Sequence, residues 1–225
     1  MTFPPRNIEA VIFDFDETMI DLEPQHTAAH ARLCSAMGSD YGNMPEEFRR
    51  GSGRRVIDDV RQMGTFFRWT RGIDDLFAQR QRYFDEEIAS SAGLELMPGV
   101  ERIVRELHAR GFILAITTSA VRSSIETILG RFDLFDRFAL IVDGSEVTRG
   151  KPDPEAYLLT AGRLGIEPAR CVVFEDSAAG VGAAKRAGMF CIAVRNPRAY
   201  VFQDLTPADI LVSSFDHVEI GWFAG

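Results

Sequence analysis

Short apolar runs alternate with helical patterns along most of this chain, and this alternation restricts the possible folds more than any other feature. Apolar residues recur at three- and four-residue spacing between the runs, as in Val100, Ile103, Val104 and Leu107. The predicted strands cover residues 8–13, 112–117, 138–142, 171–174 and 190–194, with a weaker one at 210–212. Strands separated by helices predict an α/β fold in which helices cover both faces of a parallel sheet.

The alternation is interrupted once, between the first strand and Pro98. No strand pattern occurs there, and helices are predicted over residues 27–37, 54–63 and 73–89. A helical insertion directly after the first strand predicts a small all-α cap domain. We therefore predict an α/β core domain made of residues 1–19 and 96–225, and a helical cap domain made of residues 20–95.

Composition excludes several classes of partner. A chain of 225 residues with 46% hydrophobic residues can form one well-filled core plus a modest insertion. Its formal net charge of -8 disfavours nucleic acid and anionic membrane surfaces as general partners. No apolar stretch approaches the roughly 18 residues of a membrane span. Isolated cysteines and the absence of an export-type segment at the start predict a reducing, cytoplasmic compartment. For the oligomeric state we expect a monomer or a weak dimer.

Pairs of acidic residues end two of the predicted strands. Asp14 and Asp16 follow the first strand, and Glu175 with Asp176 follows the fourth. The carboxyl ends of parallel strands face the crevice in which open α/β sheets bind ligands. Several carboxylates at one place require a shared cation or a retained proton, and hard oxygen ligands suit Mg²⁺. The alternatives are a solvated acidic turn after the first strand and a simple helix cap after the fourth.

Two further segments offer groups that can hold an anion. Thr118 and Ser119 end the second strand, where a hydroxyl and the amides of the following turn can point at a phosphate. Lys151 lies between Gly150 and Pro152, before a predicted helix, and Lys185 is the other lysine of the chain. A lysine in this place can bind phosphate or restrain the carboxylates. The alternatives are an ordinary helix cap and a surface lysine.

Together, these four segments resemble the motifs of the haloacid dehalogenase superfamily of phosphoryl-transfer enzymes. Residues 14–18, Asp-Phe-Asp-Glu-Thr, resemble its first motif, Thr118 the second, Lys151 the third, and the pair at 175–176 the fourth. The resemblance extends from Val11 to about Val194. It implies a Rossmann-like parallel sheet core, and the inserted segment resembles the small helical cap of sugar-phosphate phosphatases and β-phosphoglucomutase.

The resemblance also implies roles for the residues that carry the reaction. Asp14 would attack phosphorus and form an aspartyl-phosphate, while Asp16 would protonate the leaving oxygen and later accept a proton from water. Thr118, the Ser119 amide and Lys151 would hold the phosphoryl oxygens.

The implied metal ligands for Mg²⁺ are Asp14, the Asp16 carbonyl and Asp176, with Glu175 acting through water. The expected substrate is a small phosphorylated metabolite, with a sugar phosphate as the first candidate.

Particular residues distinguish between the other activities of the superfamily. Dehalogenases lack an acid at the place of Asp16, and phosphonatases need a cap lysine, which is absent before Lys151. A β-phosphoglucomutase-like mutase stays open, because His26 matches a hinge histidine of the mutase and Arg54 resembles its cap arginine. Both are therefore candidate substrate-binding residues. A non-catalytic binding protein on the same fold is the alternative of another class.

Two residues depart from the family pattern. Glu17 stands where the family usually has glycine, so a side chain is added next to the catalytic loop. This side chain either points into solvent or narrows the pocket. Leu22 replaces a more usual small polar residue.

Overall fold

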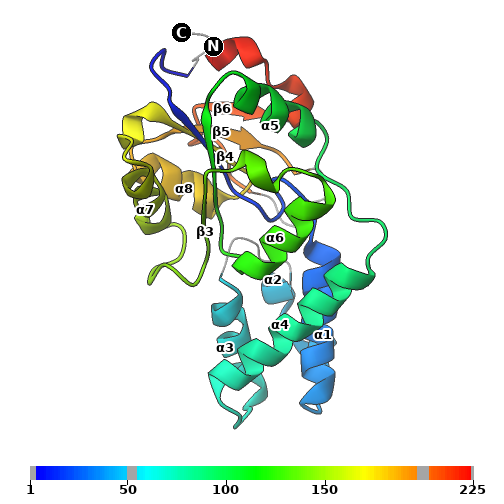
Figure 1. The fold of residues 1–225 in the computed structure, drawn as a ribbon. Coiled ribbons are helices and arrows are strands. Elements are labelled where there is room, and N and C mark those ends of the chain that lie inside the picture. The colour runs from blue at the N-terminus through cyan, green and yellow to red at the C-terminus, as the bar shows by residue number, and fades with distance from the viewer. Residues whose placement is uncertain (1–3, 50–54, 197–202, 224–225) are drawn as a thin grey trace.

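A computed structural model describes residues 4–49, 55–196 and 203–223 of the chain. Six strands form one parallel sheet in the order β3-β2-β1-β4-β5-β6 (Figure 1). The strands are β1 (Ala10–Phe13), β2 (Ile113–Thr117), β3 (Leu140–Val142), β4 (Cys171–Glu175), β5 (Phe190–Val194) and β6 (Ile210–Val212). The predicted Rossmann-like α/β class is confirmed, and every predicted strand occurs.

Helices cover both faces of the sheet. Alternate residues of β1 face opposite sides, so that Val11 and Phe13 belong to one apolar cluster and Ala10 and Ile12 to another. The first cluster includes residues of α5 (Val100–Ala109) and α6 (Arg122–Arg131), and the second those of α7 (Glu155–Leu164) and α8 (Ala178–Arg186). Such burial on both faces explains why the strands are continuous apolar runs.

The strand order creates a crevice at a defined place. β1 pairs with β2 on one side and with β4 on the other. The chain continues from β2 to β3 on the first side and from β4 to β5 and β6 on the second, so the strand order reverses between β1 and β4. In doubly wound sheets, ligands bind outside the carboxyl ends of the strands where the order reverses. The residues that follow β1, β2 and β4 therefore meet at the edge where a ligand is expected.

The inserted segment is helical, as predicted. Its helices are α1 (Glu23–Ala36), α2 (Glu46–Arg49), α3 (Val56–Phe67) and α4 (Ile73–Ser90), and they lie below the sheet in Figure 1. They enclose an apolar cluster of their own, which includes Leu33, Val60 and Met63. The two connections to the sheet pair with each other through Ile20 and Leu96. The exact domain boundaries, at 19/20 and 95/96, stay a prediction.

Two helices differ from their predicted ranges. Helix α1 begins at Glu23 rather than at residue 27, because Pro24 is accommodated in a first helical turn. Helix α3 continues to Phe67, four residues beyond the predicted end, and stops at Arg68 in a left-handed conformation. Short 3-10 helices complete the chain at Tyr41–Asn43, Phe135–Arg137, Pro168–Arg170, Phe215–His217 and Ile220–Phe223.

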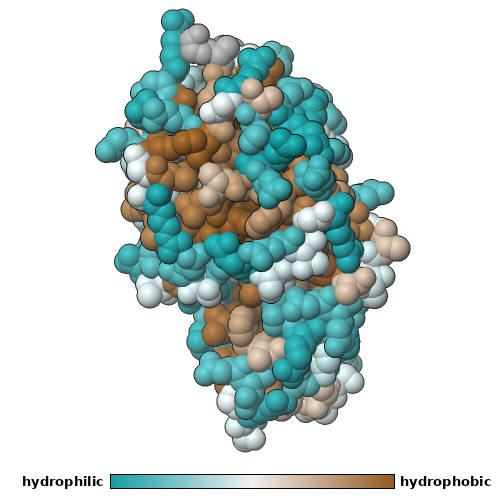
Figure 2. Space-filling view, in the orientation of Figure 1, coloured by the Kyte–Doolittle hydropathy of each residue, from teal (hydrophilic) through white to brown (hydrophobic). Residues whose placement is uncertain are grey.

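The visible surface is mixed. In Figure 2 the larger hydrophobic area lies on the upper, sheet-bearing part of the molecule, and hydrophilic residues cover much of the rest. Within the described ranges, every helix is too short or too polar to pass through a lipid bilayer.

Candidate active site

Asp14 lies directly after β1, and its backbone amide continues the pairing with β4 by donating to Phe174. Its carboxylate is buried and receives two hydrogen bonds. Lys151 Nζ donates to Oδ1 at 2.6 Å, and Thr18 Oγ1 donates to Oδ2 at 3.1 Å. The strand end therefore presents one carboxylate at a fixed position between a cation and a hydroxyl.

Glu175 ends β4 and is completely buried. Its Oε1 accepts hydrogen bonds from Lys151 Nζ at 2.5 Å and from the Tyr157 hydroxyl at 2.6 Å. Its Oε2 accepts from the amides of Asp176 and Ser177 and from the Ser177 hydroxyl. Both oxygens of Glu175 therefore have donors from the protein, and the charged one among these donors is Lys151, which Glu175 holds in place.

Asp14, Glu175 and Asp176 form an acidic group that fits a divalent cation. One oxygen from each carboxylate lies within 4.8 Å of the others, and all three residues are buried. Burial raises the pKa of Asp14 to about 7, an effect that Lys151 opposes and that repulsion from Glu175 increases. Burial, together with repulsion from Glu175 and Asp14, raises the pKa of Asp176 well above its usual range. The three carboxylates can carry more negative charge than the single positive charge of Lys151 neutralises. A Mg²⁺ ion, which prefers such oxygen ligands, would neutralise the remainder.

Lys151 is a charged group that is locked in place. It lies in the loop before α7 with only 4% of its side chain exposed. Burial alone lowers the pKa of an ammonium group, but Asp14 and Glu175 outweigh it and raise the pKa of Lys151 above its ordinary value. Lys151 therefore stays protonated while it contacts both carboxylates.

Asp16 is connected to the helical insertion. Its Oδ2 lies 3.1 Å from His26 Nε2, in the first turns of α1, and Arg80 of α4 donates to His26 Nδ1. An arginine can only donate, so Nε2 carries the proton that His26 donates to Asp16. Asp16 Oδ1 is buried and has no hydrogen-bond partner among the described residues. This oxygen is therefore available to a bound molecule.

Arg80 is a cation inside the helical insertion and is completely buried. Its guanidinium lies 4.8 Å from the centre of the Phe84 ring, and Phe84 also stacks on His26. Burial lowers the pKa of Arg80 to about 10, so the group remains charged at neutral pH. Arg80 and Phe84 together fix the orientation of the His26 ring.

Thr118 follows β2 and is buried at the same edge of the sheet. Its amide donates to Val142 and its hydroxyl accepts from the amide of Ala120 at 3.1 Å, and the half-buried Ser119 lies between them. Lys151 Nζ lies 3.4 Å from the carbonyl of the preceding Thr117. The structure thus brings this strand end next to Lys151, while the phosphate-binding roles of Thr118 and Ser119 stay predictions.

Of the predicted cap residues, Arg54 lies outside the described residues. The neighbouring Arg55 directly precedes α3 and donates to the carbonyls of Val147 and Thr148, in the loop that leads to Lys151. It also pairs with Asp58. Arg55 therefore joins the helical insertion to the core.

Several residues of this network carried no role in the sequence-based prediction. Thr18 Oγ1 lies between Asp14 Oδ2 at 3.1 Å and Asp176 Oδ1 at 2.9 Å, and the two carboxylates share its single hydroxyl proton. Tyr157 of α7 donates to Glu175, and Arg80 of α4 donates to His26. No local pattern identifies these two residues, because their partners are distant in sequence.

Gly180 provides a direct test of this arrangement. A Cβ atom at this position of α8 would lie 1.8 Å from Glu175 Oε1. Replacing Gly180 with alanine should therefore destabilise the protein by at least about 2 kcal/mol, because Glu175 would have to leave its buried donors. Helix propensity alone predicts the opposite sign, a gain of up to about 1 kcal/mol.

The matched control is Gly162→Ala in α7, where the added Cβ atom would meet nothing within 4 Å. Urea denaturation of both variants measures the difference. A Gly180→Ala protein as stable as the Gly162→Ala protein would contradict the described packing around Glu175.

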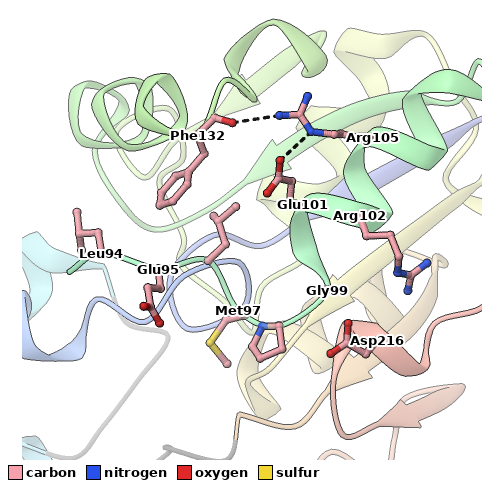
Figure 3. Close-up of a pocket in the computed structure, with 11 residues that line it drawn as sticks. Leu94, Glu95, Met97, Gly99, Glu101, Arg102, Arg105, Phe132 and Asp216 are labelled. Carbon is pink, nitrogen blue, oxygen red and sulfur yellow. Dashed lines mark hydrogen bonds and ion pairs between the residues drawn. The ribbon is translucent and has the colours of Figure 1, made fainter. Parts of the chain in front are cut away.

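A pocket of about 660 Å³ lies elsewhere, beside the second connection between the insertion and the core (Figure 3). Its wall includes Met97, Phe132 and Arg105, and Arg105 donates to Glu101 and to the Phe132 carbonyl. None of the predicted site residues lines this pocket. The acidic group at the strand ends remains the candidate active site.

Comparison with known proteins agrees with this geometry. A family profile described as haloacid dehalogenase-like hydrolase matches residues 8–188. Validoxylamine A 7'-phosphate phosphatase of Streptomyces hygroscopicus subsp. limoneus is 31% identical, over 95% of this chain and 96% of its own. Hexitol phosphatase B of Escherichia coli K12 is 31% identical, over 93% of this chain and 94% of its own.

A solved structure is similar over nearly the whole chain. The crystal structure of CbbY from Rhodobacter sphaeroides, in complex with phosphate, superimposes with a TM-score of 0.79 at 27% sequence identity. The similarity covers 93% of this chain and 96% of that one. It therefore includes the helical insertion as well as the sheet.

Proposed function

This chain belongs to the haloacid dehalogenase-like hydrolase family, and we propose that it hydrolyses small phosphate monoesters, with phosphorylated sugars as the first substrate class. The observation that carries the proposal is the position of Asp14. Its carboxylate is held at the end of β1 by Lys151 at 2.6 Å and by Thr18 at 3.1 Å. Asp16, two residues further along, keeps a buried oxygen that has no hydrogen-bond partner in the described part of the chain. Relatives that are 31% identical over almost the whole chain are named as phosphatases of small phosphorylated compounds.

The first chemical step is assigned to Asp14 and Asp16. An Asp14 oxygen attacks phosphorus, the bond between phosphorus and the ester oxygen breaks, and Asp16 gives its proton to the leaving oxygen. Asp16 is suited to this role because its Oδ1 receives no hydrogen bond from residues 4–49, 55–196 or 203–223, and its Oδ2 is held by His26. The products are the free alcohol and a phosphorylated Asp14.

The second step restores the enzyme. Asp16, now ionised, removes a proton from a water molecule, whose oxygen attacks phosphorus. The bond between Asp14 and phosphorus breaks, and inorganic phosphate leaves. During both steps Lys151 remains charged and near the phosphoryl oxygens, where it opposes their negative charge.

The residues present fit Mg²⁺, and Asp14, Asp176 and the Asp16 carbonyl would hold it, with Glu175 acting through water. When bound, the ion would shield the carboxylates from the incoming phosphate.

A mutase is the second candidate, because His26 occupies the mutase-like hinge position and contacts Asp16. A mutase transfers the phosphoryl group of Asp14 to another hydroxyl of a sugar phosphate. It requires a sugar bisphosphate to start turnover and must exclude water while Asp14 is phosphorylated.

The test is phosphate release from a panel of sugar, sugar-alcohol and small-acid phosphates, with Mg²⁺ and with EDTA. Release that requires Mg²⁺ supports the phosphatase and identifies its substrate class. Conversion of β-glucose 1-phosphate after addition of a bisphosphate, without phosphate release, supports the mutase. Inactivity in both assays overturns the proposal.

If these carboxylates bind Mg²⁺, the stability of the folded protein should depend on pH, and this can be measured without an activity assay. Asp14 has a pKa of about 7 in the folded protein against 3.8 ordinarily, so between these values the unfolded chain has released a proton that the folded protein keeps. The stability of the metal-free protein should therefore fall as the pH rises from about 4 to about 7. Mg²⁺ should remove this loss, because it favours the ionised carboxylates.

We expect Mg²⁺ to raise the melting temperature at pH 8 by about 5 °C or more, and at pH 5 by much less. Differential scanning calorimetry with Mg²⁺ and with EDTA measures both shifts. The Asp176→Asn variant is the control and should show a smaller shift at pH 8. Equal shifts at the two pH values in the wild-type protein would contradict a site made of these carboxylates.

A further inference from the structure

Glu17 has an unusual backbone conformation. Its φ angle is 63°, and among the described residues other than glycine only Arg68 and Asp133 also have a positive φ. A left-handed conformation costs a residue with a side chain about 1 kcal/mol or more. Glycine, the residue usual in the family at this position, avoids that cost. The Glu17 side chain must therefore make contacts that offset the strain.

The Glu17 carboxylate caps a helix from outside. Its Oε1 accepts hydrogen bonds from the amides of Leu22 at 3.1 Å and Glu23 at 3.0 Å, at the beginning of α1. The first turn of α1 needs an acceptor, because Leu22 in the capping position has no suitable side chain. Glu17 supplies this acceptor, and Asp21 Oδ1 also accepts from the Glu23 amide at 3.3 Å.

The same carboxylate is also fixed to the core. Its Oε2 accepts from Asn196 Nδ2 at 2.8 Å, just after β5, and Asn196 is 6% exposed. Glu17 thus joins three parts of the molecule, namely the loop after β1, the first helix of the insertion and the end of β5. The side chain does not point into solvent, and its oxygens are used by backbone and side-chain donors.

Helix α1 transmits this restraint to the reacting groups. His26 lies within one turn of the amides that Glu17 binds, and its own amide donates to Leu22 at 2.9 Å. The His26 ring in turn donates to Asp16 over 3.1 Å. A shift of the first turn of α1 would therefore move His26 relative to Asp16.

We propose that Glu17 is a positioning residue, which fastens the start of α1 to the core and thereby holds His26 against Asp16. The proposal rests on the proposed function, because it concerns the proton that Asp16 gives to the leaving group. Glu17 does not contact the reacting atoms. The alternative is a purely structural helix cap, whose loss would weaken the fold without a selective effect on proton transfer.

The experiment compares substrates that differ in their need for a proton. An alkyl phosphate such as a sugar phosphate has a poor leaving group, whereas p-nitrophenyl phosphate has a leaving group that departs with little protonation. The main variant is Glu17→Gly, which removes the carboxylate and relieves the backbone strain. The matched control is Asp133→Gly, which relieves the same kind of strain (φ 55°) at a side chain that is 89% exposed.

In Glu17→Gly we expect kcat for the alkyl phosphate to fall by about 10- to 100-fold, which is a part of the roughly 10²- to 10⁴-fold that general acid catalysis contributes. For the aryl phosphate we expect a fall of less than about 3-fold, because its leaving group gains little from that proton. Glu17→Gln, which keeps an acceptor for the helix amides, should recover most of the loss. Asp133→Gly should resemble the wild-type enzyme with both substrates.

A double-mutant cycle with His26→Ala tests whether Glu17 acts through His26. In the His26→Ala background, Glu17→Gly should cause no further change in the ratio of the two rates. If Glu17→Gly does not fold, Glu17→Asn replaces it, since asparagine tolerates a positive φ and is too short to reach both amides. Selective loss of the alkyl phosphate reaction in the variant that folds would be the supporting result.

Equal losses with both substrates, no loss with either, or a further selective loss in the His26→Ala background would overturn the role of Glu17. A failure of the proposed function is recognised separately, since the wild-type enzyme would then release phosphate from neither substrate. The two failures are therefore distinguishable in one series of measurements.

Discussion

Replacing Asp14 with asparagine is expected to reduce phosphate release by at least about 10⁴-fold, because an amide cannot replace the attacking carboxylate. The fold should persist, since an asparagine oxygen can still accept from Lys151, which donates to Asp14 over 2.6 Å. Removing one of the clustered charges should even stabilise the metal-free protein. The assay is phosphate release with Mg²⁺, together with thermal unfolding to verify the fold.

The control for Asp14 is Asp209→Asn. Asp209 also accepts hydrogen bonds from a lysine, Lys185, but lies in another part of the sheet, beside Cys191. This variant should keep the wild-type rate. If Asp14→Asn kept its activity, Asp14 would not be the nucleophile and the proposed mechanism would fail.

Replacing Lys151 with methionine is expected to impair both catalysis and folding. The variant leaves Asp14 and Glu175 buried without their cation, and breaking a buried ion pair in this way costs about 3–5 kcal/mol. Phosphate release should fall by about 10²- to 10³-fold or more, because Lys151 also opposes the charge of the phosphoryl oxygens. Urea denaturation and steady-state kinetics measure the two effects.

A second substitution separates these effects. Lys151→Met combined with Glu175→Gln should regain much of the stability, since one of the unpaired charges is removed, but it should not regain activity. Lys185→Met, at the other lysine of the chain, should leave the rate unchanged. Recovery of activity in the double variant would show that Lys151 acts only on stability.

The strands and the acidic residues at their ends were predicted well, because both are visible as local patterns in the sequence. Apolar runs of strand length mark segments that are buried on both faces, and all six were found within about two residues of their predicted ends. Asp14, Glu175 and Asp176 were expected together because parallel strands place their carboxyl ends at one edge, and the structure groups them within 4.8 Å. The family was likewise recognisable from the residues around these strand ends.

Helix ends were less accurate, because they depend on contacts made from outside the helix. The start of α1 was placed too late, since its first amides are bound by Glu17 and not by a side chain of the usual capping position. The sequence showed that Glu17 departs from the family pattern but left open whether it points into solvent or into the pocket. In the structure it does neither.

What the sequence determined by itself is the fold class, the family and the carboxylates at the strand ends, because each is expressed in a short periodic or contiguous pattern. What only the tertiary structure decided is which side chains support them. Tyr157 donates to Glu175, and Gly180 leaves room for its side chain. Arg80 orients His26 toward Asp16. Glu17 accepts from the first amides of α1. These contacts join residues from different strands and helices, and they depend on strand order and helix packing, which no local period encodes.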